Sequence, residues 1–212
     1  KALGIFLLTL STGAVGYGQY YVLQHLPFID CLPYKRGNDI KEQMKVPEGA
    51  IPDSISIQMS FLKNGKTVQF DVNQFPADFD STYVYQDRKE VLIQKGNGMV
   101  AKIVDFSLFT LNNEDSTESL FNSSTPYVLI FSGNIDSSIP WDTLIKTIQE
   151  KHQQVYLITA DKSNALQLKL DIPVLVGDMT MIKTAARVWP TIAIMNGATI
   201  MEKQSYIDFL KK

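Results

Sequence analysis

The first stretch of the chain is a run of apolar and small residues, with no charged side chain from position 2 to position 24. A helix needs about 20 mostly apolar residues to cross a bilayer, so this run predicts a membrane-spanning helix over residues 1–24. Tyr17, Tyr20 and Tyr21 stand near its end, where tyrosines often meet lipid headgroups. Two other interpretations stay open: a secretory signal peptide that starts at Lys1, and a helix buried in a protein core.

In the next stretch, residues 25–50, Pro27 and Pro33 stand six positions apart, a spacing that disfavours a regular helix and favours extended backbone. We expect a proline-containing juxtamembrane linker. In a sharper version of this interpretation, Phe28 and Tyr34 enter the membrane interface while Lys35 and Arg36 contact lipid phosphates.

In the middle of the chain, apolar residues occupy every second position from 55 to 61 and again from 68 to 72. Asn64-Gly65 lies between these stretches, and Asn-Gly tolerates positive φ at both central positions of a type I′ turn, so the pattern predicts a β-hairpin. Apolar residues at 83–85 and 91–93 predict two more strands, separated by four charged residues. Residues 51–99 are therefore expected to form a small four-stranded antiparallel module.

Beyond residue 100, continuous apolar runs alternate with amphipathic stretches. Residues 127–131 are all apolar, as a strand buried on both faces requires, and the apolar residues from Trp141 to Ile148 recur with helical spacing. The expected elements are strand 127–131, helix 141–148, strand 155–159, helix 164–170, strand 174–176, helix 178–187, strands 191–195 and 198–201, and helix 206–210. This order predicts an α/β fold for residues 100–212.

Composition removes several classes of function. The chain has 20 basic and 22 acidic residues, which does not favour a basic nucleic-acid surface. Cys31 is the single cysteine, so an internal disulfide or a Cys-x-x-Cys pair is excluded, and His25 and His152 are too far apart in sequence to indicate a Cys/His metal cluster. Motifs of nucleotide-binding loops, serine hydrolases, zinc peptidases and EF-hands are absent. We expect no metal, no cofactor and no nucleic-acid partner.

The order of elements resembles the thioredoxin fold, with an inserted helix and strand of the kind found in peroxiredoxins and membrane-tethered thiol oxidoreductases. Trp189-Pro190-Thr191 matches the position of that family's cis-proline, and residues 103–108 look like its lead-in strand. Asp136 and Ile139 stand about where the family carries its two cysteines, and neither exchanges thiols. The resemblance implies a thioredoxin-like domain without redox cysteines. It also implies a candidate binding groove near Asn134, Asp136, Trp189 and Pro190.

A second resemblance is carried by the uncharged first segment together with the stretches HLPFIDCLPYKRGNDI, DFSLFT and GDMTMIKTAARVWPTIAIMNGATI. As a set they resemble the C-terminal portion of DoxX-like membrane proteins of Bacteroidetes. This resemblance implies an inner-membrane protein with its C-terminal domain in the periplasm, in contact with a protein partner or a neighbouring membrane subunit.

The leading hypothesis is therefore a non-catalytic, membrane-tethered interaction module. Two alternatives stay open. One is an accessory subunit of a quinone-linked membrane redox complex whose chemistry lies in a membrane region outside these residues. The other is a secreted soluble binding protein.

Overall fold

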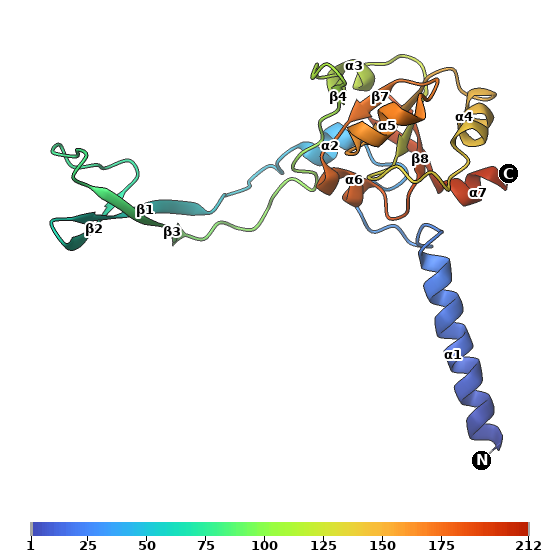
Figure 1. The fold of residues 1–212 in the computed structure, drawn as a ribbon, viewed down its shortest axis with the longest axis horizontal. Coiled ribbons are helices and arrows are strands. Elements are labelled where there is room, and N and C mark those ends of the chain that lie inside the picture. The colour runs from blue at the N-terminus through green and yellow to red at the C-terminus, as the bar shows by residue number, and fades with distance from the viewer. Residues whose placement is uncertain (1, 212) are drawn as a thin grey trace. The chain divides into compact units, whose positions relative to one another are not determined.

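A computed structural model describes residues 2–211, which form a mixed α/β protein of two compact units (Figure 1). The second unit is Val46–Ala101, close to the antiparallel module expected at 51–99. The first unit comprises the residues before and after this insertion, up to Lys45 and from Lys102 onward. The chain therefore leaves the first unit, forms the second, and returns.

A six-stranded sheet forms the centre of the first unit, with strand order β4-β7-β6-β5-β8-β9. The three strands β5, β6 and β7 are parallel to one another, whereas β4, β8 and β9 pair antiparallel with their neighbours. The strands are β4 (Phe109–Thr110), β5 (Tyr127–Phe131), β6 (Val155–Thr159), β7 (Val174–Val176), β8 (Thr191–Asn196) and β9 (Thr199–Ser205). The strands expected from the apolar runs are confirmed, although β9 extends further than expected.

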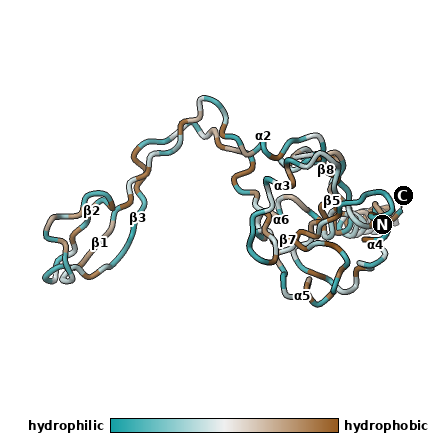
Figure 2. Tube along the Cα trace, turned by 90° about the horizontal axis from the view of Figure 1, so that it is seen from above, coloured by the Kyte–Doolittle hydropathy of each residue, from teal (hydrophilic) through white to brown (hydrophobic). Residues whose placement is uncertain are grey.

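Helices cover both faces of this sheet. Alternate residues of a strand point to opposite faces, and in β5 Leu129 belongs to the apolar cluster on one side while Val128 and Ile130 belong to the cluster on the other. Figure 2 shows apolar positions gathered at these inner strands. The helices are α3 (Thr117–Phe121), α4 (Trp141–Gln149), α5 (Lys162–Leu168), α6 (Met179–Ala185) and α7 (Tyr206–Leu210). The four helices expected between residues 141 and 210 are confirmed with end shifts of at most two residues, and α3 was not expected.

Part of the segment expected to be a linker, residues 25–50, belongs to the core of the first unit. Tyr34 and Ile40 are only 3% and 1% exposed. Between them, the backbone N–H of Gly37 donates to the carbonyl of Ile200 in β9 at 2.7 Å. The linker prediction is wrong here because proline spacing says nothing about the backbone partners that an edge strand needs. The expectation that Tyr34 enters a lipid interface is also wrong, since its ring is buried.

Two helices belong to this N-terminal part of the first unit. The short helix α2 (Ile40–Met44) begins after Asp39, whose side chain accepts a hydrogen bond from the N–H of Glu42. The long helix α1 (Ala2–Val22) forms where the uncharged run predicted a helix, and its large apolar side chains are exposed.

The membrane-spanning interpretation of residues 1–24 is not supported. Among the helices of residues 2–211, none is at once long enough and apolar enough to cross a membrane. Glycine, serine, threonine and tyrosine residues dilute the apolar content of α1, although they leave it free of charge.

The second unit is a three-stranded antiparallel sheet with strand order β2-β1-β3. Strands β1 (Ser54–Lys63) and β2 (Lys66–Asp71) form the expected hairpin, in which Asn64 and Gly65 both have positive φ, of 51° and 77°. Strand β3 (Val84–Gln94) is continuous, so the expectation of four strands is wrong. The charged residues 87–90 do not interrupt it, because they pair with β1 through the backbone while their side chains are exposed.

An aromatic cluster stabilises this sheet on one side. The ring of Phe61 is buried at its centre, with neighbouring ring centroids 5.1 to 6.2 Å away. The ammonium group of Lys63 contacts the Asp78 carboxylate at 2.6 Å and the Tyr83 hydroxyl at 2.8 Å, which fixes the loop before β3. The neighbours of Phe61 in the cluster are Phe70, Phe75, Phe79, Tyr83 and Tyr85.

Candidate functional site

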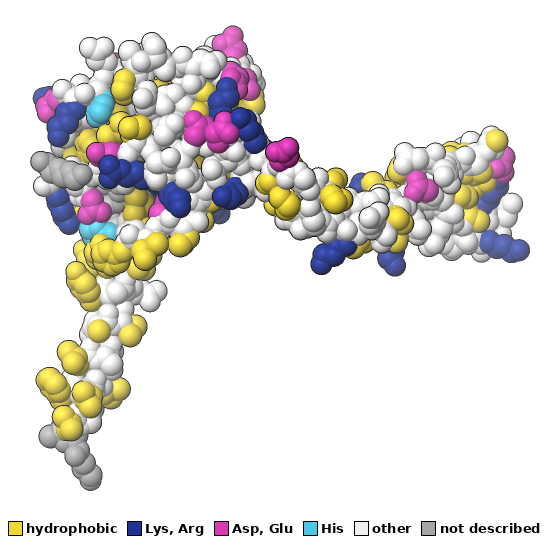
Figure 3. Space-filling view, turned by 180° about the vertical axis from the view of Figure 1, so that it is seen from behind, with side chains coloured by type: hydrophobic (Ala, Val, Ile, Leu, Met, Phe, Trp, Pro, Cys, Tyr) yellow, Lys and Arg dark blue, Asp and Glu magenta, His cyan; other side chains and the backbone are white. Residues whose placement is uncertain are grey.

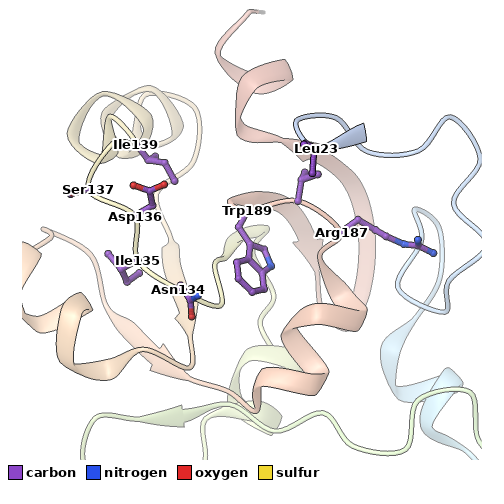
Figure 4. A pocket seen from close by; sticks show the side chains of 9 residues that line it. Leu23, Asn134, Ile135, Asp136, Ser137, Ile139, Arg187 and Trp189 are labelled. Atoms are coloured by element: carbon purple, nitrogen blue, oxygen red, sulfur yellow. The ribbon is translucent and has the colours of Figure 1, made fainter. Parts of the chain in front are cut away.

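A cavity of about 640 Å³ opens in the first unit where the chain leaves β5 (Figure 4). Phe131 at the end of β5 pairs with Thr191 at the start of β8, which brings the loop after β5 next to the segment before β8. Loops at the carboxyl ends of parallel strands are the usual ligand sites of open α/β sheets. The cavity is lined by Leu23, Asn134, Ile135, Asp136, Ser137, Ile139, Arg187, Val188 and Trp189.

Three of the four residues expected to form a groove line this cavity: Asn134, Asp136 and Trp189. The fourth, Pro190, is buried beside it and does not line it, and the Trp189–Pro190 peptide bond is cis. Sequence reasoning did not assign the other lining residues to the groove, although it had noted Ile139 at a cysteine position of the resembled family. For Leu23 no local signal exists, because it is brought to the cavity only by the fold.

The position of the Trp189 ring depends on a glycine. A Cβ atom added to Gly133 would lie 2.5 Å from two carbons of this ring and 2.9 Å from the sulfur of Met179. Only a residue without a side chain lets the indole lie against the start of the loop. The indole Nε1 is buried and donates to no acceptor among residues 2–211, which is unusual because buried donors are normally paired.

Charges of opposite sign stand at the rim of the cavity. The carboxylate of Asp136 accepts a hydrogen bond from the Ser138 N–H at 2.8 Å, and hydrogen bonds from the backbone and side chain of Ser138 lower the pKa of this carboxyl. Asp136 is therefore ionised at neutral pH. The guanidinium group of Arg187 is exposed, and Figure 4 shows the two side chains on opposite sides of Trp189. Ile139, which is buried, adds apolar surface to the lining beside Asp136.

The loop itself is held by internal hydrogen bonds. The indole N–H of Trp141 donates to the carbonyl oxygen of Asp136 at 2.9 Å, and the N–H of Ile135 donates to the Asp161 carboxylate at 3.4 Å. Helix α4 begins only at Trp141, so Asp136 and Ile139 precede its first turn.

Two smaller cavities, of about 280 and 470 Å³, flank the same loop on the side of α5. Ser137 lines all three cavities, and Leu168 lines both of the smaller ones. The loop is thus a ridge between hollows.

The polar groups around the main cavity can recognise a ligand by charge and hydrogen bonding. Its lining residues include neither histidine nor cysteine. Cys31 is exposed and lies outside the lining. Within residues 2–211, no group of three or more His, Cys, Asp or Glu side chains is placed to hold a metal ion.

Comparison with known proteins gives a match in the second unit alone. Residues 57–95 match a family model described as a domain of unknown function, DUF8463. The match begins in β1 and ends directly after β3, so it follows the three-stranded sheet. Neither the curated proteins nor the solved structures contain a match to the chain. The chain is thus similar to this family over less than half of its length, and the similarity carries no statement about activity.

Proposed function

We propose that this chain is a non-catalytic binding module, in which a thioredoxin-like domain receives a protein partner in the cavity beside Trp189. The strand order β6-β5-β8-β9, with β8 antiparallel to both neighbours, supports the thioredoxin-like interpretation. The observation that carries the proposal is the cavity itself. It lies at the loop where active thioredoxin-like proteins would carry their cysteines, and the lining here contains no thiol.

The lining favours a polypeptide segment as the occupant. A volume of about 640 Å³ is within the range of ligand sites. Apolar surface from Ile139 and Val188 accepts an apolar side chain, while Asp136 and Arg187 offer one charge of each sign at the rim. An apolar residue flanked by polar or charged residues fits this combination.

The module is held at a membrane protein through α1. This helix has no charged residue, and its exposed apolar side chains lie on all sides, which is typical of a helix surrounded by apolar neighbours. Gly13, Gly16 and Gly18 permit close helix packing of the kind used inside membranes. A helix covered by other helices needs less apolar surface of its own than one that crosses lipid alone. This arrangement agrees with the resemblance to DoxX-like proteins, whose inner-membrane location would place the domain in the periplasm.

Site-specific photocrosslinking tests the binding site. A benzophenone side chain is introduced at Ser137, within the cavity, or at Glu150, an exposed residue at the end of α4, in cells that express the full-length protein. We expect a discrete crosslinked product from position 137 only, and we expect Arg187→Glu to weaken it because the rim charge is reversed. The same crosslinked product from positions 137 and 150, or a product from position 137 whose yield Arg187→Glu does not change, would refute the cavity as the binding site.

A disulfide-reduction assay tests the proposal that the chain does not catalyse thiol exchange. With dithiothreitol as reductant and insulin as substrate, we expect the chain to reduce disulfides no faster than the blank, because thiol exchange of this type requires a pair of cysteines. Turnover that persists in Cys31→Ser would show a catalytic mechanism that the proposal denies.

A further inference from the structure

The loop after α1 is fixed to the first unit at both of its ends. At one end, Nδ1 of His25 lies 2.7 Å from a carboxylate oxygen of Asp208 in α7. At the other end, the carboxylate of Asp30 lies 2.9 Å from Nζ of Lys203 in β9. Only four residues, 26–29, lie between these two contacts, so the backbone of the loop has little freedom.

Two large apolar side chains nevertheless project from this loop. Phe28 is 90% exposed and Ile29 is 79% exposed. The ring of Tyr21 stacks on His25 at 4.2 Å and on Phe28 at 5.3 Å, which links the Phe28 ring to the fixed end of the loop. The two side chains are thus held outward, and their exposure contributes nothing to the stability of the unit.

The surroundings of this loop indicate lipid as the occupant. Before it comes the uncharged helix α1, and tyrosines are gathered in its last turns. After it come Lys35 and Arg36, both exposed and without an ion pair to any residue between 2 and 211. Figure 3 shows hydrophobic side chains gathered where α1 joins the rest of the first unit, with Lys and Arg side chains on the same face. Apolar tips beside cationic side chains are complementary to the interfacial layer of an anionic membrane.

The nearby charges do not oppose this contact. Both carboxylates at the ends of the loop, Asp30 and Asp208, are paired with cationic or hydrogen-bonding partners. Arg187 acts on Asp30 and Lys211 on Asp208 through charge, so each of these two carboxylates has a further positive charge near it.

We propose that Phe28 and Ile29 form an apolar tip that inserts into the headgroup and upper acyl layer of an anionic lipid bilayer, with Lys35 and Arg36 at the phosphates. The proposal rests on the membrane tether of the proposed function and goes beyond it. It assigns a direct lipid contact to a loop of the globular domain and thereby fixes which face of the domain is turned to the membrane.

The single cysteine provides the probe for a test. Cys31 is exposed and lies two residues after Ile29, so one environment-sensitive fluorophore can be attached there without any substitution. The full chain is reconstituted with vesicles of phosphatidylcholine that contain a minority of phosphatidylglycerol. We expect the emission maximum to move to shorter wavelength on vesicle binding, and we expect quenchers attached to the upper part of the lipid chains to reduce the intensity.

Matched variants distinguish insertion of the apolar tip from nonspecific hydrophobic binding to the vesicles. The double substitution Phe28→Ser/Ile29→Ser is expected to abolish most of the wavelength shift. Val104→Ser, at another apolar residue of the same unit that is 86% exposed, is expected to leave the shift unchanged. Replacing Lys35 and Arg36 by glutamine is expected to lower the preference for anionic over zwitterionic vesicles by about fivefold per charge.

Each other outcome overturns the proposal. If the chain floats with vesicles while the fluorophore stays in water, the tip is refuted and the tether through α1 survives. If the chain does not float at all, tip and tether both fail, while the cavity is still judged by crosslinking at Ser137. If the wavelength shift requires an added membrane protein, Phe28 and Ile29 contact protein and not lipid. If Val104→Ser abolishes the shift as completely as the double substitution does, the contact of Phe28 and Ile29 is not specific.

Discussion

The ion pair between Lys203 and Asp30 permits a quantitative test of how the N-terminal segment is held. The Lys203 side chain is 4% exposed and that of Asp30 is 19% exposed. Nζ of Lys203 donates to the Asp30 carboxylate and to the carbonyl oxygen of Tyr34, both at 2.9 Å. Burial lowers the pKa of the Lys203 ammonium, and the adjacent carboxylate partly opposes this effect. The pair therefore joins β9 to residues 30–34 at a site with little access to water.

The substitution Lys203→Met removes the charge and keeps the aliphatic length. Breaking a buried pair by deleting one partner costs about 3–5 kcal/mol, because a buried charge loses its partner. The Tyr34 carbonyl also loses its donor, and burial of the methionine offsets part of the loss. We expect a net loss of about 3 kcal/mol in the free energy of unfolding of the first unit, which corresponds to a decrease of roughly 6–12 °C in its melting temperature.

Tryptophan fluorescence during urea unfolding measures this effect selectively. The chain has two tryptophans, Trp141 and Trp189, and both lie in the first unit. As a control, Lys41→Met removes an exposed ion pair to Glu118 and should cost less than about 1 kcal/mol. A loss equally small for Lys203→Met would refute the argument from burial. The reasoning would also fail if Lys203→Met/Asp30→Leu, in which no charge is left unpaired, proved less stable than the single variant.

Three further expectations follow from the same structure. Gly133→Ala should destabilise the first unit by about 1–3 kcal/mol and shift the fluorescence of Trp189, because the added Cβ would lie 2.5 Å from its ring; an unchanged emission spectrum and urea midpoint would contradict this. Phe61→Ala should cost the second unit about 3–5 kcal/mol, seen as lost aromatic circular dichroism, while tryptophan emission stays unchanged. Burial opposes ionisation of Asp208, but hydrogen bonds such as that from His25 outweigh it and hold the pKa of this carboxyl below its ordinary 3.8. Its stabilising contribution is therefore present above pH 3.8 and is lost as the pH falls through the lower folded-state value, so Asp208→Asn should flatten the decline of stability in this acid range.

Sequence patterns predicted the structure correctly where it depends on the residues of one short segment. The five apolar residues of β5 require burial on both faces, and Asn64-Gly65 adopts the positive φ angles that its turn needs, so both features could be read from the sequence. The charged residues 87–90 led to the wrong expectation of two strands. Because the residues of β3 are exposed on both of its faces, such side chains remain hydrated within a continuous strand.

The features that the sequence did not reveal depend on contacts between distant segments. Tyr34 and Ile40 look like parts of a linker until the edge of β9 is known to need partners. The same holds for the candidate site. Asn134 and Trp189 were identified through their positions in a family resemblance, whereas Leu23 joins the cavity only because the segment after α1 is fixed to α7. No periodicity in the sequence carries that information.

The insertion of the second unit gives a last expectation about how the two units depend on each other. At the point of insertion, the N–H of Ile103 donates to the carbonyl oxygen of Gln43 at 3.0 Å, so the chain returns to the place that it left. A short Gly-Ser linker in place of Val46–Ala101 can therefore close the gap without moving either end. Because the cost of loop closure changes only slowly with loop length, we expect the free energy of unfolding of the first unit, measured by tryptophan fluorescence in urea, to change by less than about 1 kcal/mol. Crosslinking from Ser137 should persist in this variant if the cavity of the first unit is sufficient for binding. Loss of cooperative unfolding would instead show that the sheet matched by DUF8463 is required for the fold around it.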